Sequence, residues 1–347
     1  MGDRAGGDPP TRPARGGRLL AVTRIAGSRP VRWGFVAAAL ALAVYAIVKD
    51  WRHIGHDLAI LGIGDIAGAL AAVVLALAMT AAMWWQLLAA LGSPLPLRTA
   101  ARILFIGQLG KYLPGSIWPV LAQMELGKAH QVPRHRSASA SVLLMLFSLI
   151  GGLLTSLLTL PFASGSMPYR WALLAIPLLL VLVWPRVLNA IIDRLLKLAR
   201  QPPLETPLSG RAVIGALSWS FAGWVFYGLQ IWILATRLGA PAGKTVLIAI
   251  GGFAFAWCIG FIVVFAPAGA GVRDVLLLLV LGQVLSTASA TVVVLISRVL
   301  LTVADLLCAG LAAAFTRRPR PGPPVPPSGQ PEPGQPEHAA RAEQTDS

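Results

Sequence analysis

Six ionisable side chains lie inside segments of this sequence that are otherwise apolar. They are Lys111, Glu125, Arg273, Asp274, Arg298 and Asp305. A charged group at the centre of a membrane-spanning helix costs about 2.5–3.5 kcal/mol on insertion scales, so such groups are rare and mark functional sites by default. Arg298 and Asp305 are seven residues apart, which puts them on one helix face about 10 Å apart. We expect them to line one polar slot without forming a direct salt bridge.

Two turns rich in Pro and Gly lie beside these charges, one after Lys111 and one before Arg273. Backbone N–H groups at the start of the helix after the second turn are unpaired and attract anions, and a guanidinium grips a phosphate through two hydrogen bonds. The pattern predicts a binding site for an anionic group such as a phosphate. Its predicted residues are Lys111, Pro114, Gly115, Pro267, Gly269, Gly271, Arg273, Asp274, Arg298 and Asp305.

Structural interpretations of the same residues stay open. Asp274 suits a first-turn acid that stabilises the helix dipole, and Arg298 and Asp305 suit ion pairs that only hold helices together. Lys111 is placed to extend toward the membrane surface. Pro and Gly break helices in either interpretation, but a broken helix within the bilayer must be buried in protein or line a cavity.

The composition excludes a water-soluble globular protein. Hydrophobic residues make up 56% and charged residues 12% of the 347 residues, with a mean hydropathy of +0.71, whereas soluble domains contain about 25% charged residues. The alternating ten-residue segments of a β-barrel are absent from the sequence. The net charge of +15 has its simplest cause in basic cytoplasmic loops, so no nucleic-acid partner is expected. We predict an all-α polytopic membrane protein.

The apolar segments predict six full spans and two re-entrant hairpins, with eight continuous spans as the alternative. The segments are 33–48, 66–91, 137–162, 171–184, 212–235, 245–265 and 287–315, and the hairpins are predicted over 101–122 and 245–285. The halves 33–162 and 171–315 both follow the order span, span, hairpin, span, from opposite sides. This order is typical of an inverted-topology repeat with a site at broken helices near the midplane.

The ends of the chain are predicted to be disordered. Residues 1–31 form a basic arm rich in Gly and Pro, 32–316 the transmembrane domain, and 317–347 a Pro-rich tail. Arginines in the arm and directly after the last span place both termini in the cytoplasm, on a multi-pass protein of the cell membrane. An amphipathic segment over 186–200 suits either a helix on the anionic cytoplasmic leaflet or a plain connector.

Motifs of enzymes and cofactor sites are absent from the sequence. It contains no CxxC, HExxH, GxSxG or Walker-type pattern, and its two cysteines lie in apolar segments. An intramembrane lipid-modifying enzyme would need a nucleophile or an acid–base constellation, and none is recognisable. We therefore expect no enzyme activity, no cofactor and no metal site, and transport without bound ATP, passive or ion-coupled.

Two strings resemble the signatures of the lysylphosphatidylglycerol synthase transmembrane-region family. They are Gly107-Gln-Leu-Gly-Lys-Tyr-Leu-Pro-Gly-Ser-Ile-Trp-Pro119 and Pro267-Ala-Gly-Ala-Gly-Val-Arg-Asp274, the second followed by Ser297-Arg298 and Ala304-Asp305. The resemblance covers about 33–315. It implies the flippase half of a two-part protein, without the aminoacyl-transferase domain and its synthase activity. Many members have Gly-Gly-Asp and Arg after the first Pro-Gly, where this chain has Ser116-Ile-Trp-Pro-Val120.

Two functions follow as hypotheses. The first is translocation of an anionic lipid or a polyprenyl-phosphate-linked intermediate between leaflets, with the headgroup held by Arg273, Arg298 and Lys111 and with Asp305 orienting Arg298 or carrying a coupled proton. The second is a non-transporting scaffold for an enzyme of envelope glycan or glycolipid synthesis, such as a membrane or peripheral glycosyltransferase. Its docking surfaces would be the arm, the 186–200 helix and the tail.

Overall fold

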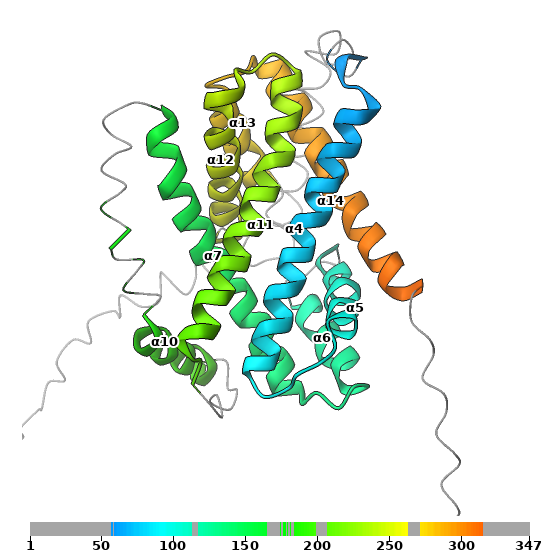
Figure 1. The fold of residues 1–347 in the computed structure, drawn as a ribbon, viewed down its shortest axis with the longest axis vertical. Helices are drawn as coiled ribbons and strands as arrows, with labels where there is room; N and C mark the ends of the chain where they lie inside the picture. The colour runs from blue at the N-terminus through cyan, green and yellow to red at the C-terminus, as the bar shows by residue number, and fades with distance from the viewer. Residues whose placement is uncertain are drawn as a thin grey trace, which may run out of the picture. The chain divides into compact units, whose positions relative to one another are not determined.

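The computed structural model describes residues 57, 59–112, 117–164, 184–198, 207–262 and 271–314, with isolated positions between 174 and 181. Every regular element in these residues is helical (Figure 1). The elements are α4 (Ile63–Ala90), α5 (Leu97–Gln108), the 3-10 helix η1 (Leu109–Tyr112), α6 (Trp118–Lys128), α7 (Arg134–Ser164), α10 (Pro185–Leu198), α11 (Gly210–Arg237), α12 (Ala242–Ile262), α13 (Val272–Leu281) and α14 (Thr287–Ala314). The predicted arm, the 33–48 span, most of 171–184 and the tail lie outside the described residues.

Five helices are long and apolar enough to cross a membrane. They are α4, α7, α11, α12 and α14, and they have between 21 and 31 residues. At 1.5 Å per residue, 21 residues reach about 31 Å, close to the thickness of the hydrocarbon core. The five coincide with predicted apolar segments, so the prediction of an all-helical, multi-pass membrane protein is confirmed.

Three of the helices around the predicted hairpins are too short to cross. α5, α6 and α13 have 12, 11 and 10 residues, which is about 18 Å or less. α5 and α6 lie in the segment predicted as the first hairpin, and α13 follows α12 in the second. α12 is itself long enough to span, so the two helices of the 245–285 segment differ in length. The total number of spans and both hairpins stay predictions.

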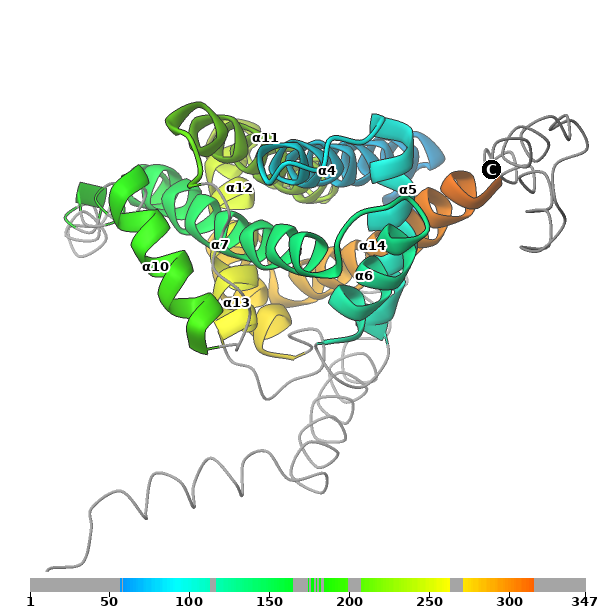
Figure 2. The same ribbon diagram turned by 90° about the horizontal axis from the view of Figure 1, so that it is seen from below.

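α4 and α11 form an antiparallel pair. The Nε of Arg237 lies 3.1 Å from Oδ2 of Asp65 and joins the end of α11 to the start of α4. At the other end, Nε2 of Gln86 donates to the carbonyl oxygen of Ala212 at 3.3 Å. Figure 2 shows the two helices side by side, with α7, α12 and α14 on the same side of the pair. All three of these helices pack against α11.

The packing of the first half has a counterpart in the second. α4, α5, α6 and α7 correspond in order to α11, α12, α13 and α14, and every substantial contact between two of these eight helices reappears when the halves are exchanged. α12 packs on α7 as α5 packs on α14, and α13 packs on α14 as α6 packs on α7. Each half therefore places a hairpin helix against the last long helix of the other half.

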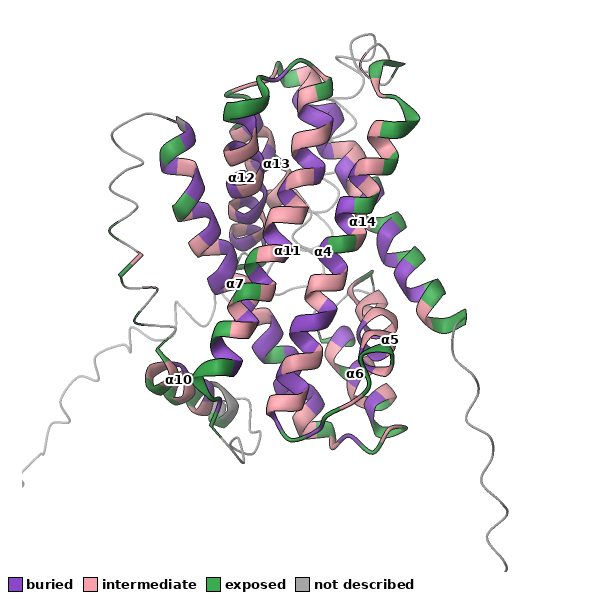
Figure 3. Ribbon diagram, in the orientation of Figure 1, coloured by how far each residue is buried: buried purple, intermediate pink, exposed green. Residues whose placement is uncertain are grey.

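Buried side chains form two clusters along the α4–α11 pair. One includes Trp84 and Phe147 and takes in residues of α5 and α10, and the other includes Phe253 and takes in residues of α12, α13 and α14. Phe105 of α5 packs against both clusters. Figure 3 shows exposed positions along α14, where exposed leucines such as Leu306 suit contact with lipid chains.

α11 and α12 approach each other closely at Gly228. A Cβ at this position would lie 2.3 Å from the Cα of Ile250, closer than any side chain tolerates. Small residues allow such backbone contact between helices in membranes, where packing replaces the hydrophobic effect as the driving force. Gly310 in α14, by contrast, has open space where a Cβ would be.

We expect Gly228→Ala to destabilise the protein by about 1–3 kcal/mol, because the added methyl forces the two helix backbones apart. The measurement is the unfolding midpoint of the purified protein in detergent. Gly310→Ala is the matched control and should leave the midpoint unchanged or raise it slightly, since alanine favours helices. Equal midpoints for the two variants would contradict the close approach.

Candidate functional site

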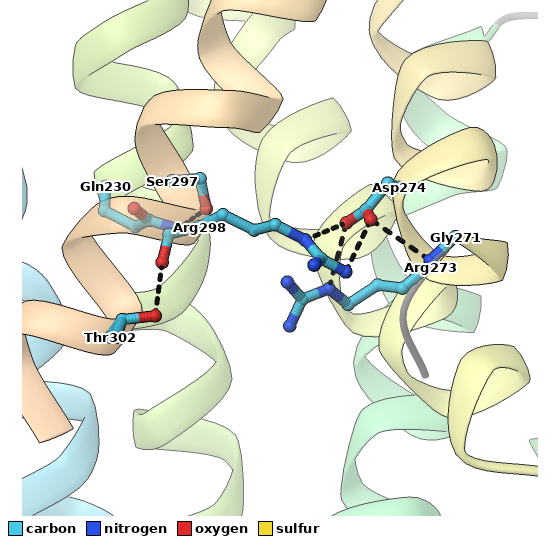
Figure 4. Close-up of polar contacts among 7 residues, drawn as sticks. All are labelled: Gln230, Gly271, Arg273, Asp274, Ser297, Arg298 and Thr302. Carbon is cyan, nitrogen blue, oxygen red and sulfur yellow. Dashed lines mark hydrogen bonds and ion pairs between the residues drawn. The ribbon is translucent and has the colours of Figure 1, made fainter. Parts of the chain in front are cut away.

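Arg298 of α14 forms a two-pronged ion pair with Asp274 of α13. Its Nε donates to Oδ1 at 3.1 Å, and its Nη2 lies 2.6 Å from Oδ2 (Figure 4). Paired contacts of this kind fix orientation and are stronger than neutral hydrogen bonds. The side chain of Arg298 is 40% exposed and that of Asp274 20%, so the arginine keeps donors that a ligand can reach.

Asp274 also caps the helix that carries it. The N–H of Gly271 donates to Oδ2 of Asp274 at 3.2 Å, and Asp274 is the acidic residue in the first turn of α13. Gly271 has a φ of 92°, in the left-handed region that favours glycine. Asp274 therefore caps the start of α13 and is also the ion-pair partner of Arg298.

Arg273 lies next to this pair but is held less tightly. Its Nε is 3.6 Å from Oδ1 of Asp274. This Nε atom is buried and has no hydrogen-bond partner among the described residues. Its guanidinium carbon lies 5.9 Å from the centre of the Phe253 ring, within range of a cation–π contact. Gly260 of α12 leaves room for its stem, because a Cβ there would lie 3.2 Å from the Cβ of Arg273.

The second ion pair joins α14 to the first half of the chain. Nζ of Lys111, in η1, lies 2.6 Å from Oδ2 of Asp305. The hydroxyl of Tyr112 donates to the same oxygen at 2.7 Å. The side chain of Asp305 is only 6% exposed, whereas Lys111 is 35% exposed. The buried carboxylate thus has two partners, both at the end of the α5–η1 segment.

α14 therefore connects both predicted hairpins through opposite charges. Arg298 binds the acid at the start of α13, and Asp305 binds the lysine at the end of η1. Arg298 and Asp305 each have an ion-pair partner on a different element, and that they line one polar slot stays a prediction.

Three residues of the site were not predicted from the sequence. Tyr112 stands beside a turn rich in Pro and Gly, and Phe253 is one of many apolar residues in its segment, so the sequence distinguishes neither. Gln230 of α11 is fully buried, and its Nε2 donates to Oγ of Ser297, the residue before Arg298, at 2.7 Å. An amide within an apolar span was the available signal for Gln230.

Other predicted positions fall outside this arrangement. Pro114, Gly115, Pro267 and Gly269 lie outside the described residues. Glu125 pairs with Arg134 at an exposed position between α6 and α7, away from the site. Within the described part of the chain, no group of three or more His, Cys, Asp or Glu side chains is arranged to hold a metal ion.

A double-mutant cycle on Lys111→Ala and Asp305→Ala should give a coupling energy of about 1–3 kcal/mol, because Asp305 is buried and loses its charged partner. The measurement is the free energy of unfolding in mixed micelles. The control cycle uses Arg134 and Glu125, an exposed pair expected to couple by less than about 1 kcal/mol. Similar coupling in the two cycles would mean that the Lys111–Asp305 pair is as weak as a surface contact.

Comparison with known proteins gives one match. The family model described as the lysylphosphatidylglycerol synthase TM region matches residues 32–309. No curated protein sequence matches the chain. The match includes every described residue of the two ion pairs and covers more than half of the sequence. The chain therefore belongs to the lysylphosphatidylglycerol synthase transmembrane-region family.

Proposed function

We propose that the protein translocates an anionic lipid, or a polyprenyl-phosphate-linked intermediate, between the leaflets of the cell membrane. The observation that carries this proposal is the excess of cations where α14 contacts α13 and η1. Lys111, Arg273 and Arg298 lie there with only two carboxylates, Asp274 and Asp305. Charges inside apolar helices are retained where they serve a ligand or ion pathway.

The proposed path for the headgroup lies between two re-entrant hairpins of an inverted repeat. Three observations support this topology: α5, α6 and α13 are too short to span, α4 and α11 are antiparallel, and the contacts of one half correspond to those of the other. In transporters built this way, substrate binds at the broken helices and the two halves rock around the site.

The proposed orientation puts α5, α6 and α10 on the cytoplasmic side. In Figure 1 these helices lie near the same end of the α4–α11 pair. They and their flanks carry many basic residues, namely Arg98, Arg102, Lys128, Arg134, Arg136, Arg186, Arg194, Lys197 and Arg211. The opposite end has Arg237 and Lys244 with Asp65. The positive-inside rule then supports cytoplasmic termini.

A scaffold for a glycan- or glycolipid-synthesising enzyme is the second candidate, and α10 is the feature that favours it. Leu188 and Ile192 anchor this helix in the core, while Arg186, Arg194 and Lys197 are exposed. A fixed helix with a basic outer surface suits a docking site for an acidic surface of a peripheral enzyme or for anionic lipid. A scaffold would need no cations in the membrane interior, which is why we rank it second.

Translocation is tested by leaflet exchange of fluorescent phosphatidylglycerol in proteoliposomes, read by quenching from outside. Arg298→Ala and Arg273→Ala should each slow exchange by about 10- to 100-fold, because each removes charge-assisted hydrogen bonds worth about 1.5–3 kcal/mol. Arg237→Ala is the control, since it removes a paired arginine at the far end of α11, and it should exchange at the wild-type rate.

Two other results would each contradict a part of the proposal. Wild-type exchange no faster than in protein-free vesicles, across several anionic headgroups, would favour the scaffold. Fast exchange that survives both arginine substitutions would place the site elsewhere.

The topology is tested by the accessibility of single cysteines in a chain whose Cys258 and Cys308 are replaced. Pro94→Cys and Ala129→Cys flank α5 and α6, Gly243→Cys lies in the first turn of α12, and Gln283→Cys follows α13. Two hairpins predict that a membrane-impermeant thiol reagent labels the first two from one side and the last two from the other. Labelling of either couple from opposite sides would support continuous spans.

A further inference from the structure

The charges of the site do not balance. Three cations, Lys111, Arg273 and Arg298, face two carboxylates, Asp274 and Asp305, so the described site carries a net charge of +1 when all five groups are ionised. In a medium of low dielectric constant, each unbalanced charge is costly for the protein to keep. The net charge of the site therefore determines how much opposite charge a bound ligand can bring.

The unbalanced cation is Arg273. Asp305 forms an ion pair with Lys111 at 2.6 Å, and Asp274 is contacted by two guanidinium nitrogens of Arg298. Arg273 approaches Asp274 only to 3.6 Å. Its Nε has no hydrogen-bond partner in the described part of the chain, and its main contact on the other side is the ring of Phe253.

Among the described residues, Arg273 contacts Asp274, the Phe253 ring and Gly260. None of these adds a positive charge that could balance a second negative one. The other described ion pairs, Arg237 with Asp65 and Arg134 with Glu125, are neutral in sum and do not include any residue of the site. A ligand with one negative charge makes the site neutral, whereas a dianion leaves it with a charge of −1.

We propose that the site selects lipids whose headgroup is a singly charged phosphodiester over phosphomonoesters and diphosphates. This inference rests on the proposed function and names its substrate class. Arg273 and the free donors of Arg298 bind the phosphodiester oxygens, while Asp274 and Asp305 keep their contacts with Gly271 and Tyr112. Glycerophospholipids and polyprenyl-linked phosphosugars both supply such a monoanion, so the test includes one of each.

The experiment compares exchange rates of three fluorescent lipids in proteoliposomes at pH 8. Phosphatidylglycerol and a polyprenyl phosphosugar are monoanionic phosphodiesters, whereas phosphatidic acid is a phosphomonoester whose second ionisation at alkaline pH brings it toward a dianion. The wild type should exchange at least one of the two phosphodiesters at least about tenfold faster than it exchanges phosphatidic acid. The faster of the two phosphodiesters identifies the source of the headgroup.

Charge-altering variants separate net charge from local structure. Asp305→Asn keeps an oxygen for Tyr112 but raises the site to +2, so it should reverse the preference in favour of phosphatidic acid. The double variant Lys111→Gln with Asp305→Asn returns the site to +1 and should restore the phosphodiester preference. Asp65→Asn, a paired carboxylate remote from the site, is the matched control and should keep the wild-type preference.

The possible failures are distinguishable. Equal rates for all lipids, or a wild-type preference for phosphatidic acid, would overturn charge selection while leaving translocation in place. A preference that Asp305→Asn does not change would also overturn it. If no lipid moves faster than in protein-free vesicles, translocation fails, and short-chain versions of the lipids then decide the inference by their thermal stabilisation of the detergent-purified protein. Stronger stabilisation by phosphatidic acid, or equal stabilisation, would overturn the selection as well.

Discussion

The need to neutralise charge inside an apolar helical protein governs the arrangement of this site. α14 supplies side chains of both signs. It contributes a cation, Arg298, to the helix of one predicted hairpin and an anion, Asp305, to the other. Removing either partner would leave a charge in surroundings of low polarity, which is far more costly than losing a surface contact. The ends of η1 and α13 are therefore held against the same helix by electrostatics as well as by packing.

Close backbone packing makes this arrangement possible. Gly110 of η1 lies against the backbone of Trp118, and Gly260 of α12 lies against Arg273. η1 and α6, and likewise α12 and α13, therefore come together at a glycine of the first element. With the helices this close, the charged side chains reach α14 in a compact conformation. The correspondence between the two halves extends from the order of the helices to the places where they touch.

The sequence was sufficient to find the charged residues but not to pair them. The cost of charge in an apolar environment singled out six side chains. Five of them, Lys111, Arg273, Asp274, Arg298 and Asp305, take part in the ion pairs around α14. The sixth, Glu125, pairs with Arg134 at an exposed position instead. Their partners depend on which helices are adjacent, and Asp305 and Tyr112 are 193 residues apart in the chain. Helical periodicity compares residues only within one helix, which is why it grouped Arg298 with Asp305 and missed the bonds that each makes to another element.

The same limit applies to the fold. Hydropathy located the five long helices because a run of about twenty apolar residues is typical of a membrane-spanning helix. It could not distinguish a short helix pair from a single span over 101–122, since the apolar content of both is the same. η1 and α6 come together where Gly110 lies against the backbone of Trp118, and average hydropathy does not encode this contact.

The double bonding of Asp274 bears on how an anion could enter and leave. When a phosphate takes the donors of Arg298, Asp274 is not left without partners, because the N–H of Gly271 still donates to it and Arg273 is 3.6 Å away. The exchange of one acceptor for another on Arg298 then costs less than breaking an isolated buried pair, which strands a charge. Asp305 likewise has a second partner, because the hydroxyl of Tyr112 still donates to it if Lys111 binds a ligand. Each carboxylate thus has a neutral donor that remains when its cation is engaged elsewhere, and this is the property that a site needs if it is to bind an anion in the membrane interior and release it again.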